Sequence, residues 1–136
     1  MKYDELIELA FKAASKAYVP YSKFRVGAIV KCKDGSLYQG CNIENCSYPA
    51  GVCGERTAIF NAYADGKRKE DIEVLVIVTL DGNKISTSCG VCRQVMSELL
   101  LPDTPVIFAS KKLPGQYVET NMKELLPYSF SSEDLE

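Results

Sequence analysis

Apolar residues near the start of the chain recur at the spacing of an α-helix, and strand-like runs follow. Residues 2–18 are predicted to form a helix that Pro20 ends, and its apolar face consists of Leu6, Ile7, Ala10, Phe11 and Ala14. Residues 24–32 and 36–42 are typical of strands, and Lys33-Asp34-Gly35 supplies a turn between them. So short a connection permits only antiparallel pairing, which predicts a β-hairpin.

The rest of the chain alternates helices with strands. We predict helices at 53–65, 90–100 and 121–126, and strands at 73–80, 106–109 and 118–120. The inward residues of the first two helices are expected to be Ala58, Ile59, Ala62, Val91, Val95, Met96 and Leu99. The apolar run 74–78 is typical of a strand covered on both faces. This order predicts an α/β fold in which residues 1–136 form a single three-layer α/β/α domain around a mixed sheet of about five strands.

The charge balance narrows the possible partners. The 136 residues carry a net charge of −2, and the one basic run, Lys67-Arg68-Lys69, is followed at once by Glu70-Asp71. A protein that grips a nucleic-acid backbone normally shows a positive surface, so we expect a small-molecule partner and no nucleic acid. The sequence has no apolar signal region and no window of membrane-span length, so we expect no membrane partner and a cytoplasmic location.

The chain contains six cysteines and no histidine, which limits its chemistry. In a reducing compartment cysteines remain thiols or bind metals rather than forming disulfides. The lack of histidine excludes every histidine-based triad. Hydrolytic chemistry in this chain must therefore rely on cysteine, carboxylate, lysine, tyrosine or a metal.

Two cysteine-bearing segments stand where predicted helices begin. They are Cys53-Gly54-Glu55-Arg56 and Ser88-Cys89-Gly90-Val91-Cys92-Arg93. A Cys-x-x-Cys pair at a helix start points both sulfurs toward one place, and the positive end of the helix dipole lowers the pKa of thiols. A third sulfur from Cys53 completes three protein ligands. Three ligands and a water are typical of a catalytic zinc site.

Glu55 and two arginines extend this metal hypothesis. Glu55 is two residues from Cys53, so it can reach past a metal, accept a proton from an activated water and deliver it to a substrate nitrogen. Three thiolates on Zn²⁺ leave an excess negative charge, which opposes ionisation of that water. Arg56 and Arg93 follow soon after ligands, and we expect both to hydrogen-bond to the sulfurs.

Two other interpretations of the cysteines stay open on these residues alone. A structural zinc module would use four protein ligands and would give Glu55 no role. A thiol redox protein would form a reversible Cys89–Cys92 disulfide and would hold little zinc. The remaining cysteines, Cys32, Cys41 and Cys46, are expected to be buried or half-buried thiols.

Taken together, these motifs resemble the small, homotetrameric cytidine deaminase family over almost the whole chain. Besides the two cysteine segments, the likeness rests on Tyr21-Ser22-Lys23-Phe24-Arg25-Val26-Gly27-Ala28, Gly40-Cys41-Asn42-Ile43-Glu44-Asn45, Leu125-Leu126-Pro127-Tyr128-Ser129-Phe130 and Glu133-Asp134-Leu135. The resemblance implies hydrolytic deamination of cytidine and deoxycytidine to uridine and deoxyuridine, with release of ammonia, by a zinc-activated hydroxide and a glutamate proton shuttle in pyrimidine salvage. The alternative is a zinc deaminase that acts on another cytosine-containing small molecule, such as a nucleoside antibiotic.

The resemblance also implies the roles of particular residues. Cys53, Cys89 and Cys92 would ligate one Zn²⁺ per subunit, and Glu55 would carry protons. The substrate-binding residues would be Phe24, Asn42, Glu44, Tyr48, Gly54 and Phe130. Among these, Asn42 and Glu44 would bind the ribose hydroxyls, and the Gly54 backbone N–H would meet the pyrimidine carbonyl. In a homotetramer with active sites at subunit interfaces, Phe130 would stack on the base in a neighbouring subunit, and Tyr48 would help to build the shared site.

Two positions depart from the family pattern. Ser88 stands where the family usually has proline before the second cysteine pair, and Gly54 replaces a more usual alanine. The backbone carbonyl of residue 88 remains, so we expect catalysis to survive, with a looser loop because serine does not fix φ.

Overall fold

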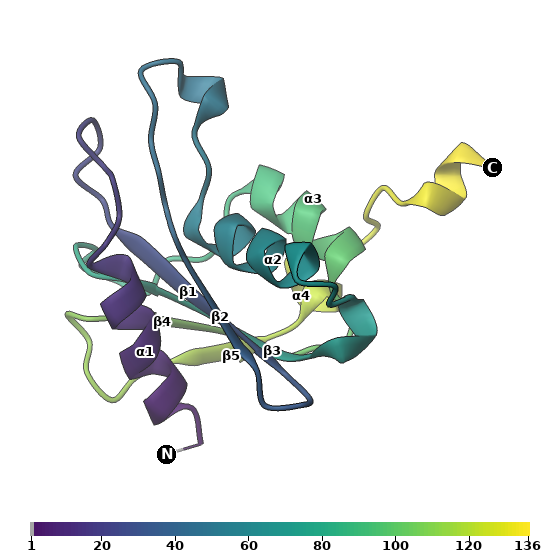
Figure 1. Ribbon diagram of the computed structural model, residues 1–136, viewed down its shortest axis with the longest axis horizontal. Helices are drawn as coiled ribbons and strands as arrows, with labels where there is room; N and C mark the ends of the chain where they lie inside the picture. The colour runs from purple at the N-terminus through teal and green to yellow at the C-terminus, as the bar shows by residue number, and fades with distance from the viewer. Residues whose placement is uncertain (1) are drawn as a thin grey trace.

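The computed structural model, shown in Figure 1, describes residues 2–136. Its helices are α1 (Asp4–Ala14), α2 (Gly54–Ala64), α3 (Gly90–Leu99) and α4 (Met122–Leu125), with short 3₁₀ turns at Tyr48–Ala50, Lys69–Asp71 and Ser132–Leu135. Its strands are β1 (Val26–Cys32), β2 (Leu37–Cys41), β3 (Ile72–Thr79), β4 (Val106–Ser110) and β5 (Val118–Thr120). Within residues 2–136, no helix combines the length and the apolar character needed to cross a membrane.

The five strands form one mixed sheet in the order β2-β1-β3-β4-β5. The β1–β2 hairpin is antiparallel, as predicted, and β1 also pairs antiparallel with β3. The only parallel pair among the described strands is β3 and β4, and α3 connects them. A parallel pair needs such a crossover. The start of α3 therefore lies near the end of β3, where Thr79 pairs with Val26 of β1.

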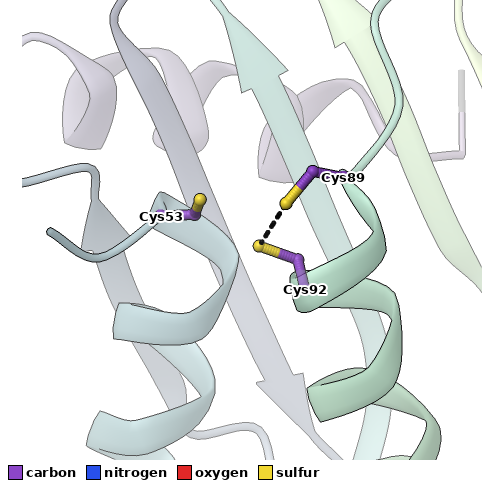
Figure 2. Close-up of side chains that lie close together, drawn as sticks. All are labelled: Cys53, Cys89 and Cys92. Atoms are coloured by element: carbon purple, nitrogen blue, oxygen red, sulfur yellow. Dashed lines mark hydrogen bonds between the residues drawn. The ribbon is translucent and has the colours of Figure 1, made fainter. Parts of the chain in front are cut away.

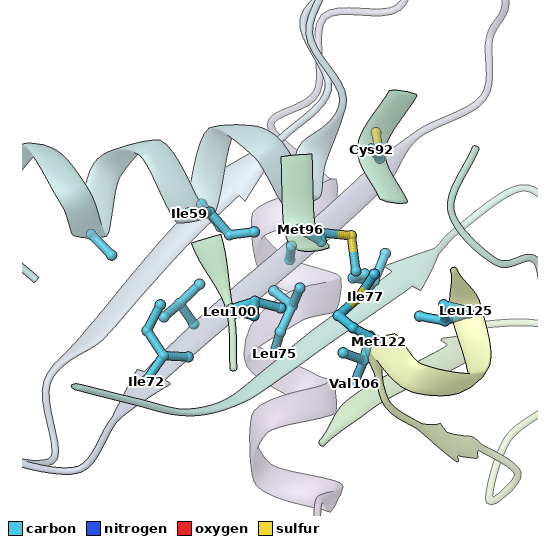
Figure 3. Close-up of a cluster of buried hydrophobic side chains, with 14 of the residues drawn as sticks. Ile59, Ile72, Leu75, Ile77, Cys92, Met96, Leu100, Val106, Met122 and Leu125 are labelled. Atoms are coloured by element: carbon cyan, nitrogen blue, oxygen red, sulfur yellow. The ribbon is translucent and has the colours of Figure 1, made fainter. Parts of the chain in front are cut away.

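Alternating residues of the central strands pack into two separate apolar cores, one on each face of the sheet. Leu75 and Ile77 pack with α2, α3 and α4 on one face, whereas Val74, Val76 and Val78 pack with α1 on the other. Figure 3 shows the first core, in which Ile59 and Met96 extend from the helices toward Leu75 and Ile77. Burial on both faces explains the unbroken apolar run of β3. The three-layer α/β/α architecture with a mixed sheet is thus confirmed.

A close contact between β2 and α2 fixes the position of the helix that follows Cys53. A Cβ added to Gly40 would lie 2.3 Å from the Ala58 nitrogen, so only glycine lets the strand approach the helix backbone this closely. The helix so placed begins at Gly54, directly after Cys53.

Some predicted boundaries and orientations differ from the structure. The first helix ends at Ala14 rather than at residue 18, because Tyr18 pairs with the chain beyond β2: its N–H donates to the Asn42 carbonyl, and its carbonyl accepts from the Glu44 N–H. Val91 was expected to face inward, but it is 60% exposed on the first turn of α3. Cys46, expected to be at least half-buried, is exposed.

Candidate metal centre and catalytic cleft

Three cysteine sulfurs from two helix starts meet at one place. Cys53 is the N-cap residue of α2 and Cys89 is the N-cap residue of α3, while Cys92 lies in the first turn of α3. Figure 2 shows their side chains pointing toward a common space between the two helices. The three sulfurs all lie within 4.8 Å of one another. The positive N-terminal ends of two helix dipoles therefore lie beside the sulfurs.

The spacing of these sulfurs fits a tetrahedral zinc ion. Zn–S bonds of about 2.3 Å place two sulfurs of one tetrahedron about 3.8 Å apart. The Sγ atoms of Cys89 and Cys92 are 3.7 Å apart. Within residues 2–136, the cluster that meets metal-ligand spacing contains these three cysteines and no fourth side chain. Three protein ligands leave a coordination position for solvent, which distinguishes a catalytic site from a closed structural one.

The pKa values of two of the thiols shift in opposite directions. A hydrogen bond with Cys92, and further hydrogen bonding from Arg56, lower the pKa of Cys53 to about 5 against the opposing effect of burial. The same hydrogen bond to Cys53, together with burial, raises the pKa of Cys92. The metal-free cluster therefore keeps a proton among its sulfurs. A divalent cation would displace it, because thiolates are the form that binds zinc.

The two arginines have different surroundings. Arg56 Nη2 lies 3.6 Å from Cys53 Sγ, so it donates to a sulfur as we expected. Arg93 instead donates from Nε to the Ser88 carbonyl at 2.8 Å, from Nη1 to the Leu125 carbonyl at 2.7 Å and from Nη2 to Thr87 Oγ1 at 2.9 Å. Arg93 thus joins the loop before α3 to α4, rather than meeting the sulfurs.

Glu55 lies in the first turn of α2 and is only 4% exposed. Its Oε2 accepts a hydrogen bond of 2.6 Å from the Ser88 hydroxyl. Burial raises the pKa of Glu55, and the bond from Ser88 opposes that rise. A buried carboxyl group with a raised pKa suits a residue that must both accept and release a proton.

A cleft of about 280 Å³ collects half of the site residues predicted from the sequence. Its wall includes Phe24, Asn42, Glu44, Cys53, Glu55 and Cys89. The size of this cleft suits a small molecule, and its wall combines apolar side chains with carboxyl, amide and hydroxyl groups. Two sugar-binding candidates are already held in place at its rim. Asn42 Oδ1 accepts from the Val26 N–H at 2.9 Å, while its Nδ2 donates to the Phe24 carbonyl at 2.8 Å.

Glu44 is held by the segment that precedes Phe24. Its Oε1 accepts from the Tyr21 and Ser22 N–H groups, each at 3.1 Å, and its Oε2 accepts from the Ser22 hydroxyl. The Ser22 hydroxyl bond is the main cause that lowers the pKa of Glu44. Glu44 therefore presents a negative charge at the cleft at neutral pH.

Of the remaining substrate-binding candidates, Gly54 directly follows Cys53, whereas Tyr48 and Phe130 are exposed. Gly54 is buried, and a Cβ there would lie 3.0 Å from the Val26 carbonyl oxygen. Tyr48 is 76% exposed and borders a neighbouring hollow of about 370 Å³ that also contacts Glu44. Phe130 is 58% exposed in the C-terminal segment, which extends away from the body of the molecule (Figure 1).

Two polar groups of the cleft were not predicted from the sequence. One is the Ser88 hydroxyl, whose position had drawn attention only for its missing proline. The other is Thr79 at the end of β3, whose buried Oγ1 has no hydrogen-bond partner among the described residues. A single hydroxyl closing the apolar run 74–78 was the available signal.

The fold and the site define a class: an α/β protein with a three-thiolate metal centre beside a buried carboxyl group. The model of the family described as the cytidine and deoxycytidylate deaminase zinc-binding region matches residues 1–108, and the chain belongs to this family. The resemblance noted from the motifs is thereby confirmed, and the donor set agrees with the zinc that the family description states.

Individual relatives agree over nearly the whole chain. A cytidine deaminase of Halalkalibacterium halodurans is 47% identical over 130 residues, covering 96% of this chain and 95% of that protein. A cytidine deaminase of Sporosarcina psychrophila is 44% identical over 135 residues, covering 99% of this chain and 96% of that protein. The crystal structure of cytidine deaminase from Burkholderia pseudomallei superposes with a TM-score of 0.89 at 41% identity, covering 96% of this chain and all (100%) of that chain.

Proposed function

We propose that this protein deaminates free cytidine and deoxycytidine by hydrolysis, giving uridine or deoxyuridine and ammonia. The observation that carries the proposal is the convergence of Cys53, Cys89 and Cys92 beside a small cleft, which the buried Glu55 also lines. Relatives named cytidine deaminase, similar over nearly the full chain, support the nucleoside as substrate rather than the antibiotic alternative.

The chemistry divides between the metal and the side chains. Cys53, Cys89 and Cys92 would hold zinc, which when bound supplies a Lewis acid that lowers the pKa of a water molecule to near neutral. Glu55 would accept a proton from that water and deliver it to N3 of the cytosine ring as the water oxygen bonds to C4. Glu55 would then take the proton of the new C4 hydroxyl group and pass it to the amino group, which would leave as ammonia as the C4–N bond breaks and the C4 carbonyl forms. Arg56 offsets negative charge on the Cys53 sulfur throughout.

Recognition of a free nucleoside is assigned to the polar rim of the cleft. Asn42 and Glu44 would bind the sugar hydroxyls, Phe24 would pack beside the nucleoside, and the Gly54 N–H would meet the pyrimidine carbonyl. The Glu44 carboxylate, kept ionised by Ser22, would repel a 5′-phosphate. We therefore expect cytidine to be a much better substrate than cytidine monophosphate.

The exposed aromatic residues support an assembly in which subunits share sites. Tyr48 and Phe130 are large apolar side chains that remain mostly exposed in a single chain. In the homotetramer that we propose, Phe130 stacks on the base in a neighbouring subunit and Tyr48 completes the shared site. A cytoplasmic protein of pyrimidine salvage accords with six cysteines kept as thiols and metal ligands.

The direct test is to mix zinc-loaded protein with cytidine and to measure uridine and ammonia. We expect equal amounts of the two products, and we expect Glu55→Gln to lose at least about a hundredfold in turnover while keeping its zinc. Deoxycytidine, cytidine monophosphate and a cytosine-containing antibiotic form the comparison panel. Full turnover by Glu55→Gln would refute the mechanism, and efficient turnover of the monophosphate would refute the role of Glu44.

A further inference from the structure

The Ser88 hydroxyl and the Glu55 carboxyl group form a buried contact between the two halves of the site. The oxygens are 2.6 Å apart, and the residues are 6% and 4% exposed. This distance is typical of a hydrogen bond from a hydroxyl to a carboxylate, which is about twice as strong as a neutral one. The contact joins the first turn of α2 to the residue that precedes the N-cap of α3.

The serine is itself held in place. Its carbonyl accepts from Arg93 Nε at 2.8 Å, and the same guanidinium group bonds to Thr87 and to the Leu125 carbonyl. The peptide bond after Ser88 leads directly to the zinc-ligand candidate Cys89. A hydroxyl fixed at this point therefore holds Glu55 at a defined distance from the metal ligands on α3.

The contact depends on having serine at position 88. Proline, which the family resemblance leads one to expect at position 88, has no hydroxyl and cannot donate a hydrogen bond. The carboxylate has two oxygens with about four acceptor sites, so one bond to Oε2 leaves capacity toward the cleft, which both Glu55 and Ser88 border.

We propose that Ser88 is a positioning residue for the proton shuttle: its hydroxyl fixes the Glu55 carboxylate so that the carboxylate faces both the activated water and the substrate. This inference rests on the proposed deamination. Glu55 must meet two partners in turn, and a misplacement of about 1 Å at such a group costs about a hundredfold in rate. Ser88 contributes in this way without donating a proton to the substrate itself.

The test compares Ser88→Ala with Ser88→Thr in the zinc-loaded, full-length protein. We expect Ser88→Ala to lower kcat for cytidine about tenfold or more, with KM, bound zinc and the affinity for the product uridine within about twofold of the parent protein. Ser88→Thr keeps a hydroxyl and should recover most of the lost kcat. The matched control is Ser97→Ala, which removes a serine hydroxyl bonded to the Gln94 carbonyl within α3 and should leave kcat unchanged.

The outcomes separate this inference from the proposed function. If the parent protein deaminates cytidine and Ser88→Ala does so at the same kcat, the positioning role is overturned while the function stands. A loss of kcat that follows a parallel loss of zinc, or a Ser88→Thr protein as slow as Ser88→Ala at equal zinc content, also overturns it. A parent protein that is inactive on cytidine refutes the function first.

Discussion

Single charged residues around the metal centre determine how much negative charge the site carries. Three thiolates outweigh one divalent ion, and Glu55 adds a fourth acidic group that is almost fully buried. Arg56 is the cation that touches this cluster, through Nη2 and the Cys53 sulfur at 3.6 Å. Such a hydrogen bond both orients the ligand and lowers its basicity.

Arg56→Ala is therefore expected to lower zinc affinity or turnover by about ten- to a hundredfold, although it removes no metal ligand. Turnover of cytidine and bound zinc, measured together on the same preparation, separate the two effects. The control is Arg68→Ala, because Arg68 bonds to the Tyr63 and Lys67 carbonyls far from the cluster. If Arg56→Ala turns over cytidine at the parent rate and retains its zinc, Arg56 does not tune the charge of the metal centre.

The relative positions of site residues could be predicted from the sequence where they depend only on spacing along the chain. Cys89 and Cys92 are three residues apart and Cys53 precedes Glu55 by two, so helical geometry alone places them. Contacts of long or loop-borne side chains could not be predicted in this way. Arg93 meets the Leu125 carbonyl only because α4 packs beside α3, and the Ser88 hydroxyl meets Glu55 only because α2 and α3 lie side by side.

At the scale of elements, an ion pair between Arg25 and Asp81 joins the cleft wall to the segment just after β3. Asp81, just after β3, accepts from the Arg25 backbone N–H at 2.9 Å, from Nε at 3.0 Å and from Nη2 at 2.8 Å. Arg25 stands between Phe24, in the cleft wall, and the start of β1. The side-chain bond from Arg25 is the main cause that lowers the pKa of Asp81 from 3.8 to about 2.

This pair predicts a pH dependence of stability. Because the pKa of Asp81 is lower in the folded protein, its stabilising contribution is full above about pH 4 and is lost as the pH falls toward 2. Asp81→Asn should lower the urea midpoint slightly at pH 7, with a difference that shrinks below pH 4; the effect is small because both side chains are partly exposed.

Urea unfolding of both proteins between pH 3 and pH 7 provides this comparison. Asp103→Asn is the control, because Asp103 and its partner Lys123 have 79% and 63% of their side-chain surface exposed. A difference between Asp81→Asn and the parent that grew as the pH fell would contradict the assignment.

Helices and strands were predictable where the local sequence pattern agrees with the tertiary packing. The run 74–78 became β3 because both of its faces meet apolar layers, and the tight turn at 33–35 gave the hairpin. The first helix was predicted too long because the helix-forming sequence pattern continues past Ala14. In the structure, however, the backbone of Tyr18 pairs with the segment after β2. That pairing joins residues far apart in the sequence, which a local pattern does not reveal.

At the scale of the whole molecule, the C-terminal segment carries the aromatic ring assigned to the proposed contact between subunits. It extends from the body beyond α4 (Figure 1), and Gln94 Nε2 donates to the Phe130 carbonyl at 2.9 Å. The backbone of Phe130 is thus held against α3 while its ring stays largely exposed. A ring presented in this way suits the proposed contact with a neighbouring subunit.

Phe130→Ala is expected to lower kcat/KM for cytidine by about ten- to a hundredfold, since stacking of an aromatic ring on a base contributes roughly 1–3 kcal/mol. Leu135→Ala, in the same segment and also exposed, should leave kcat/KM near the parent value. Light scattering should report four chains per particle for the parent protein.

Mixed assemblies test whether the ring acts across subunits. Chains carrying Phe130→Ala and chains carrying Glu55→Gln, dissociated and reassembled together, should regain activity, because some sites then combine an intact Glu55 with an intact Phe130. Mixtures no more active than the sum of the separate variants would contradict sharing of the site.

The central claim is that three sulfurs surround one zinc ion and leave a position open for solvent. X-ray absorption at the zinc edge, on the purified protein with its zinc content measured, tests it most directly. We predict one zinc per chain, with three sulfur neighbours at about 2.3 Å and one lighter oxygen neighbour. Four sulfur neighbours, or a protein active on cytidine without bound zinc, would contradict the account.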